Sequence, residues 1–420
     1  MTAVVTDSIE DDIAKPRSSA LYQSLLVGLL SLNFGILFFD RNALNFLMPF
    51  VKPDLGLTNT QVGLTASALS FSWALAALAI GAAADRTGRR KAFLIACTVA
   101  FSLCSFLTGL AQSFFMLFAA RLLMGVVEGG VAPVSQTMIA VAVPHARRGL
   151  AMGVMQNLGS NLLGSFLAPV MLVWFATRLG WHDAFFLAGL PGLISALLLW
   201  RFVHEPDAPP AHERSNLLTH LSTIVANRNV VLCVLTSVLL VSYLVVCWAF
   251  MPLFLTKVRG FDARTMSWLM ATLGISAAIG SFVVSGISDR IGRKPVFIVT
   301  SFAGVILPLG AMYFTGSVWL LAAIFFFGWA LTGVFPLFMG TVPSESVDAR
   351  HITTAMALVM GMGEVLGGVF SPTIAGWAAD LAGLTAPLWI MTALCVVAGL
   401  VSFALRETAP AIVKAPAVRG

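Results

Sequence analysis

The sequence predicts an all-α integral membrane protein whose twelve membrane-spanning helices form two pseudo-symmetric bundles of six. Charged residues make up 10% of the 420-residue chain and hydrophobic residues 58%, whereas a soluble domain carries roughly 25% charged residues. Apolar runs long enough to span a bilayer recur from end to end. This composition excludes a disordered chain, a secreted disulfide scaffold and an ordinary cytosolic enzyme.

Each apolar segment is expected to be helical, because a chain inside a bilayer must satisfy its own backbone hydrogen bonds. A polar stretch at 204–229 divides the segments into two sets of six. The resulting bundles cover 21–203 and 230–406, between tails at 1–20 and 407–420. The twelve segments are 21–50, 60–84, 92–111, 114–142, 149–177, 182–202, 230–256, 265–287, 296–314, 317–341, 353–378 and 385–405.

Basic residues orient the chain in the membrane. With both termini in the cytoplasm, 18 of the 25 Lys and Arg residues fall on cytoplasmic segments and five fall outside. The positive-inside rule therefore places both termini in the cytoplasm, and we expect the inner (plasma) membrane of a bacterium. Residues 1–19 lack the short apolar core and cleavage site of a signal peptide, so no removable one is expected.

The two halves repeat each other at an offset of 204 residues. GAAADRTGRRK at 81–91 follows the second segment, and SGISDRIGRKP at 285–295 follows the eighth. The same offset superposes Gly159 on Gly363. Two equivalent six-helix units joined by a cytoplasmic linker are typical of a pseudo-symmetric carrier.

The doubled D-R-x-G-R-[RK] loop in a six-plus-six arrangement resembles the major facilitator superfamily over nearly the whole chain. The resemblance implies the major facilitator fold. It also implies that the aspartate of each loop meets a neighbouring helix end, and that the basic residues help to latch one conformation. The alternative is that these charges only anchor the loops on the cytoplasmic side. The implied latch residues are Asp85, Arg86, Arg89, Arg90, Asp289, Arg290, Arg293 and Lys294.

Five ionisable residues lie at membrane depth, where each costs roughly 2.5–3.5 kcal/mol to insert, which makes them candidate functional residues. Arg41 and Arg121 lie at similar distances from the outer ends of their helices, so we expect them at the same height. Glu128 follows Arg121 by seven residues and shares its helix face. The five are Asp40 and Arg41 in the first helix, Arg121 and Glu128 in the fourth, and Glu364 in the eleventh.

These residue types suit proton-coupled transport of an anion. An arginine keeps its charge in any environment and offers a planar fork to a carboxylate. An anion that occupies the arginine leaves a nearby desolvated carboxyl easier to protonate. The alternative is that the four charges in the first and fourth helices form inert buried pairs, although apolar packing would join the helices at lower cost.

The segments FFDRNALNFLMP and RLLMGVVEGGVAP, in the first and fourth helices, resemble the anion:cation symporter branch of the superfamily. The resemblance implies that Asp40 and Glu128 are the proton-coupling carboxyls. It also implies that Arg41 contacts the organic anion and that Arg121 supports it. The same pairs of residues occur in spinster-like lipid carriers, so the resemblance specifies the coupling residues better than the substrate.

Further candidate substrate contacts lie in the fifth, seventh and eleventh helices. Phe38 stands where sugar-acid carriers of this branch commonly have tyrosine, and Ser160 where they often have glutamine, which favours a less polar carboxylate. Glu364 is expected to bind substrate or a proton, with helix packing as the alternative. The other expected substrate-binding residues are Gln156, Asn157, Ser160, Asn161, Tyr243 and Trp248.

The sequence thus predicts a secondary active transporter that imports a small organic anion, a carboxylate, together with protons by alternating access. A proton-coupled exporter of drugs or metabolites, a spinster-like lipid carrier and a non-transporting receptor remain alternatives. Against an exporter, Ala168-Pro169 replaces the glycine-proline signature of that class.

No enzyme activity, metal or cofactor is expected. The sequence has no catalytic triad and no nucleotide-binding loop, and its five cysteines lie in apolar segments without metal-ligand spacing. The expected partners are the anion, protons and the lipid bilayer. No nucleic acid is expected, because the basic residues sit in short loops. We expect a monomer.

Overall fold

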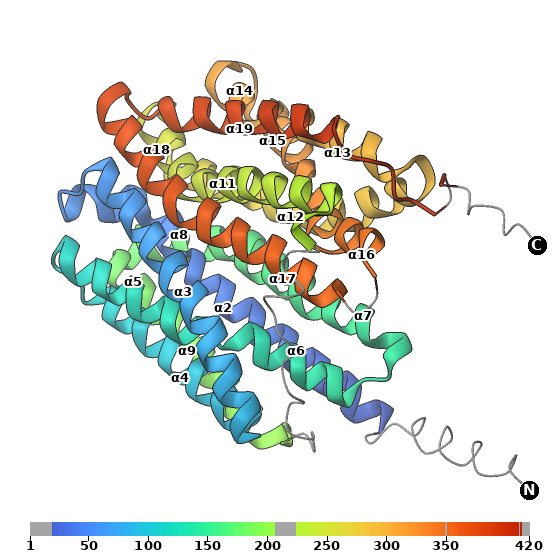
Figure 1. Ribbon diagram of the computed structural model, residues 1–420. Coiled ribbons are helices and arrows are strands. Elements are labelled where there is room, and N and C mark those ends of the chain that lie inside the picture. Colours follow the sequence, from blue (N-terminus) through green and yellow to red (C-terminus); the bar gives the residue numbers. More distant parts are fainter. Residues whose placement is uncertain (1–18, 206–223, 349–350, 411, 414–420) are drawn as a thin grey trace, which may run out of the picture.

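The protein is described here by a computed structural model, in which the helices pack side by side (Figure 1). Residues 1–18 of the predicted N-terminal tail, most of the predicted linker and the end of the C-terminal tail lie outside the described residues. The described residues are 19–205, 224–348, 351–410 and 412–413.

Ten helices in the described part of the chain are long and apolar enough to cross a membrane, and two shorter apolar helices accompany them. Together they occupy the places of the twelve predicted segments. Their large outward-facing apolar side chains, such as Leu78, Leu123 and Ile194, are exposed on the isolated protein. In a bilayer these faces contact lipid rather than water.

The N-terminal half comprises the first six spans. Several helices begin at a hydroxyl side chain that accepts a backbone N–H of the first turn, as at Ser19, Thr58 and Ser113. The elements are α2 (Ala20–Asp54), α3 (Asn59–Thr87), α4 (Arg90–Gly109), α5 (Phe114–Gly129), α6 (Val131–Ala142), α7 (His145–Gly153), η1 (Val154–Leu158), η2 (Ser160–Leu167), α8 (Ala168–Leu179) and α9 (Trp181–Phe202).

The C-terminal half comprises the last six spans. Its tenth span, predicted as continuous over 317–341, is divided into three short pieces, because Gly333 and Pro336 interrupt regular α-helix. The elements are α11 (Arg228–Lys257), α12 (Ala263–Ile291), α13 (Arg293–Ala303), α14 (Ile306–Tyr313), α15 (Val318–Trp329), η3 (Ala330–Val334), η4 (Leu337–Thr341), α16 (Val342–Ser346), α17 (Ile352–Met362), η6 (Gly363–Gly368), α18 (Val369–Ala382) and α19 (Ala386–Ser402).

The two halves meet toward one end of the molecule. The start of α2 and the end of α19 lie at the same end of the molecule in Figure 1, here called the terminal end; the opposite end is the distal end. The most extensive contacts between the halves pair α3 with α18, α2 with α11, and α8 and η2 with α12. Near the distal end, Ser67 and Thr373 share a hydrogen bond of 2.7 Å, and Phe46 meets Trp248 edge to face at 5.6 Å. The distal end is therefore closed between the halves.

The fifth and eleventh spans contain π-helical segments at equivalent places, where regular α-helix was predicted. These segments are η1 and η2 in the fifth span and η6 in the eleventh. A Cβ on Gly159 would lie 2.2 Å from the carbonyl oxygen of Ser31, and one on Gly363 would lie 2.1 Å from Oγ of Ser237. Each span therefore packs against α2 or α11 where no side chain fits. Such π segments are frequent at functional sites.

Candidate functional site

Arg41 lies at the centre of the candidate site. Its side chain is 17% exposed, and Nη1 lies 3.7 Å from Oε2 of Glu128 in α5, which is itself fully buried. The rings of Phe38 in α2 and Trp73 in α3 flank the guanidinium at 5.7 and 5.4 Å. Since a guanidinium has five N–H donors, an ion pair of this length leaves donors for another acceptor.

Arg121 joins α5 to α2 at the height of Arg41. Its side chain is buried, and Nη1 donates to the carbonyl oxygen of Arg41 at 3.2 Å and to Sδ of Met124 at 3.2 Å. This agrees with the equal depth expected for the two arginines. Nε and Nη2 of Arg121 and both carboxylate oxygens of Glu128 are buried without a hydrogen-bond partner among the described residues. Unsatisfied groups of this kind are costly, which favours a functional explanation over simple helix packing.

Asp40 is adjacent to Arg41 in sequence but contacts a different helix. The carboxylate is fully buried, and its Oδ1 accepts a hydrogen bond of 2.6 Å from Ser105 in α4. Successive residues of an α-helix point about 100° apart, which separates the two contacts. Asp40 nevertheless interacts electrostatically with Arg121. The two carboxyls of the N-terminal half thus share the two arginines.

Glu364 brings a carboxylate from the C-terminal half toward the same arginine. It lies in η6 and is partly exposed. A Cβ placed on Gly368 would lie 3.2 Å from Oε2 of Glu364 and 3.3 Å from Oγ of Ser70 in α3, so the carboxylate lies beside α3. Arg41 and Glu364 interact electrostatically. Glu364 thus adds a charge from the C-terminal half that interacts with Arg41 of the N-terminal half.

The polar residues of the fifth span are half-buried on the π segments. Gln156 and Asn157 lie in η1, and Ser160 and Asn161 lie in η2. The hydroxyl of Ser160 donates to the carbonyl oxygen of Gln156. Asn157 and Asn161 are four residues apart, which in an α-helix places both on one face, but the wider π turn changes that spacing. No contact of these four side chains with the arginines is described.

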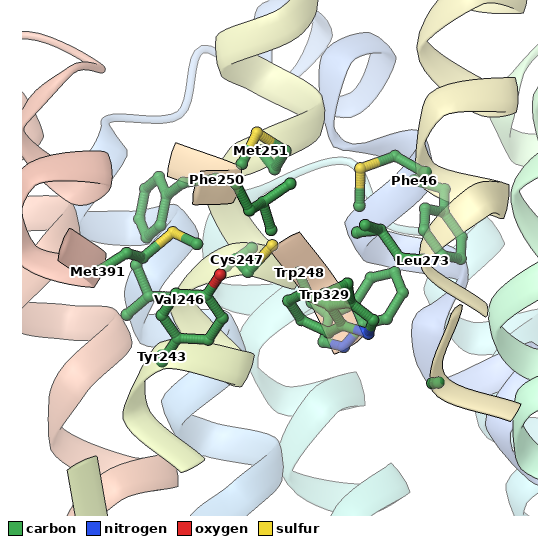
Figure 2. Packing of buried hydrophobic residues seen from close by; sticks show 14 of the residues in the cluster. Phe46, Tyr243, Val246, Cys247, Trp248, Phe250, Met251, Leu273, Trp329 and Met391 are labelled. Atoms are coloured by element: carbon green, nitrogen blue, oxygen red, sulfur yellow. The ribbon is translucent and has the colours of Figure 1, made fainter. Parts of the chain in front are cut away.

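The aromatic candidates of the seventh span lie in the apolar core rather than beside Arg41. Tyr243 is fully buried, and its hydroxyl donates to the carbonyl oxygen of Gly304 at 3.0 Å. Trp248 is 7% exposed and packs against Trp329 and, across the halves, against Phe46. Figure 2 shows this cluster. Trp248 thus contributes to the interface between the halves.

Sequence reasoning missed several partners of the charged residues. Trp73 and Ser70 in α3 and Ser105 in α4 are single residues within apolar segments, and Met124 is one apolar residue among many. No spacing rule distinguishes such residues from packing residues, because their importance depends on which helices lie side by side. Among the described residues, no group of three or more His, Cys, Asp or Glu could hold a metal ion.

The predicted latch of the C-terminal half is organised around Arg293. Its guanidinium pairs with Asp289 and, through Nη2, with Oε1 of Glu345 in α16 at 2.9 Å. The backbone N–H groups of Arg293 and Lys294 donate to Glu407 at 2.7 and 3.1 Å. Glu345 and Glu407 were not identified from the sequence. Arg290, which was predicted to belong to the latch, is exposed.

The equivalent loop of the N-terminal half follows a similar plan. Arg86 and Arg89 are exposed and Arg90 is buried, whereas the side chain of Asp85 lies outside what the structure describes. The backbone N–H of Lys91 donates to both oxygens of Glu205, each at 3.1 Å. A carboxylate following the last helix of each half thus caps the third helix of that half.

Comparisons with known proteins agree with this geometry. The profile of a family described as the Major Facilitator Superfamily matches residues 30–263 and 246–420. A probable sulfoacetate transporter of Cupriavidus necator is 26% identical over 90% of this chain and 92% of its own length. A gallate transporter of Pseudomonas putida is 28% identical over 89% of each chain. A crystal structure of a bacterial homologue of the human lysosomal transporter Spinster, inward-facing and unoccupied, has a TM-score of 0.74 at 19% identity and covers 92% of this chain and 97% of its own.

Proposed function

This chain belongs to the major facilitator superfamily of membrane transporters, and from that premise we propose that it imports a small organic anion together with protons. The chain is a multi-pass membrane protein and a transporter, not an enzyme. The observation that carries the proposal is Arg41, a partly exposed guanidinium that faces carboxylates from both halves.

The proposed substrate is a carboxylate with a partly apolar body. The planar fork of Arg41 matches two carboxylate oxygens, and such bidentate pairs are the strong charge-assisted hydrogen bonds of proteins. Phe38 and Trp73 place aromatic rings beside the guanidinium, where they would cover an apolar body. Two relatives are described as carrying gallate and sulfoacetate, which are both organic anions. They support the class of substrate.

Coupling to protons would follow from competition for Arg41. A bound anion takes the fork that now pairs with Glu128, and Glu128 is fully buried. A buried carboxylate without its cation is costly, so it takes up a proton. Anion and proton then load together, as a symporter requires. Asp40, which shares Arg121 with Glu128, is the second proposed proton site.

The direction of transport depends on orientation. The excess of Lys and Arg on one side of the membrane supports placing the terminal end in the cytoplasm of a bacterium. The distal end, closed between the halves, then faces outward, so the described state is closed to the outside. The proposed moving units of alternating access are 21–203 and 230–406. Since one chain supplies both, the proposed functional unit is a monomer.

Reconstitution into liposomes tests the proposal. Uptake of labelled gallate, benzoate and sulfoacetate would be measured with and without an imposed pH gradient, at matched membrane potential. We expect accumulation of at least one anion against its concentration gradient only when the pH gradient drives protons in the same direction. Accumulation that ignores the pH gradient would contradict proton symport, and movement opposite to the protons would favour an exporter.

A further inference from the structure

Asp380, near the distal end of α18, accepts three hydrogen bonds from the other half of the molecule. Its Oδ1 accepts the backbone N–H of Asn59 at 2.8 Å, and its Oδ2 accepts the backbone N–H and the hydroxyl of Thr60 at 2.8 and 2.6 Å. Asn59 and Thr60 are the first two residues of α3. Their N–H groups have no acceptor within their own helix. A carboxylate of the C-terminal half therefore caps a helix of the N-terminal half.

Beneath this contact, α3 and α18 pack so closely that no side chain fits at two glycine positions. A Cβ on Gly376 would lie 2.3 Å from the carbonyl oxygen of Asn59, and one on Gly63 would lie 2.1 Å from the carbonyl oxygen of Pro372. Asp380 and Gly376 lie one turn apart, so both belong to one face of α18. The two glycines let the helix backbones approach closely enough for the carboxylate to reach the end of α3.

The sequence around Asp380 has a counterpart at the other end of the same helix pair. GAAADRTG at 81–88 and GWAADLAG at 376–383 share the pattern G-x-A-A-D-x-x-G. Each aspartate lies two residues before the last residue of its helix, and each helix is followed by a glycine with positive φ, 68° at Gly88 and 83° at Gly383. Because the end of α18 meets the start of α3, the two copies lie at opposite ends of the pair.

We propose that Asp380 is the distal gate residue of the transport cycle: its carboxylate holds the distal end closed by capping α3, and release of this cap accompanies distal opening. The contact joins the two halves, so it must break when they separate at this end. A carboxylate gains stability at a helix N-terminus from both the free N–H groups and the helix dipole. A gate of this kind requires neither the proposed substrate nor proton coupling.

Cysteine labelling at Ser67 measures opening at this end. Ser67 is buried against Thr373 between α3 and α18, and the five native cysteines are buried. Ser67→Cys would be introduced in the full chain, reconstituted in nanodiscs without substrate, and treated with a polar maleimide. Nanodiscs expose both faces, so the result does not depend on orientation. The parent protein without Ser67→Cys gives the background.

Asp380→Ala should raise the labelling rate of Ser67→Cys about tenfold, because losing a charge-assisted cap shifts the equilibrium by that order. Asp380→Asn keeps one acceptor oxygen and should give a smaller rise, and it replaces the alanine variant if that variant does not fold. Asp54→Asn is the matched control: Asp54 accepts a hydrogen bond of 2.8 Å from Nε1 of Trp181 within the N-terminal half, so labelling should not change. Unchanged labelling in folded Asp380 variants, or an equal rise in Asp54→Asn, would overturn the proposal.

Discussion

Ser105 and Asp40 form a hydrogen bond of 2.6 Å between α4 and α2, in which the serine hydroxyl donates to the carboxylate. The other oxygen of Asp40 is buried and has no hydrogen-bond partner among the described residues. One oxygen is thus held in place while the other can carry a proton. Glu128 differs from Asp40, because its carboxylate pairs with the guanidinium of Arg41 and is not held by a hydroxyl group in the part of the chain that the structure describes.

Neutral replacement of either carboxyl should uncouple transport. We expect Asp40→Asn and Glu128→Gln each to abolish accumulation driven by a pH gradient while retaining exchange of internal for external anion. Exchange requires only that the loaded site reorients, whereas accumulation requires proton release. Uptake and counterflow in the same liposomes provide the measurement, with Asp54→Asn as the control carboxyl outside the site. If both neutral variants still accumulate anion, the proton assignment is wrong.

Arg41→Lys should weaken anion binding about 10- to 100-fold although the positive charge is kept, because an ammonium cannot replace a bidentate fork. Titration of the purified variant by calorimetry gives the affinity. Arg178→Lys is the control, since the guanidinium of Arg178 lies over the ring of Trp174 at 4.8 Å on the surface. A wild-type dissociation constant in Arg41→Lys would exclude direct contact with the anion.

Glu364 should be protonated when the anion binds, because two like charges near Arg41 would repel. Glu364→Gln keeps a hydrogen-bond donor, so it should preserve binding and flatten its dependence on pH. Glu364→Ala should lose affinity. Binding across a pH series compares the two variants, and Asp54→Asn, which changes a carboxyl outside the site, serves as control. An unchanged pH profile and affinity in Glu364→Ala would mean that the residue only packs between helices.

Glu407 should stabilise the protein at neutral pH and cease to do so in acid. Partial burial opposes its ionisation, but N–H donors from Ala409, Arg293, Lys294 and Thr408 outweigh this and lower its pKa below the usual 4.5. A lowered pKa stabilises the folded state above the ordinary value, and that contribution is lost as the pH falls through the lowered one. Glu407→Gln should therefore reduce the melting temperature at pH 7 and converge with wild type in acid. A difference that persists unchanged in acid would contradict this.

Gly159→Ala should destabilise the protein by about 1–3 kcal/mol, because the added methyl would meet the carbonyl oxygen of Ser31 at 2.2 Å. Gly153→Ala, in the same span, meets nothing within 4 Å and should be neutral or stabilising, since alanine favours helix over glycine. Thermal unfolding in detergent compares the two variants. Equal melting temperatures would show that the fifth span can move away from α2.

The positions of the membrane-spanning helices could be predicted, because the length of each apolar segment and the placement of its charged residues can be read directly from the sequence. The duplicated loop and the four charged residues of the first and fourth helices could be identified from the sequence in the same way. The contacts of these charges could not be predicted: Ser105, Trp73 and Asp380 gain their roles from neighbours far away in sequence. The buried hydrogen bond of Tyr243 to Gly304 could not be predicted either, because a polar aromatic in an apolar helix is equally suited to substrate contact and to a buried hydrogen bond.

The π-helical segments of the fifth and eleventh spans affect where the chain can lose a residue without losing its fold. A π turn closes its hydrogen bond over five residues instead of four, so each segment holds more residues than the α-helix of the same height. Deleting a single residue there would convert π to α and leave the faces of the flanking helices in register. The same deletion elsewhere in these spans would rotate everything beyond it by about 100°. The two spans are therefore expected to tolerate a change of length at their π segments better than elsewhere along their length.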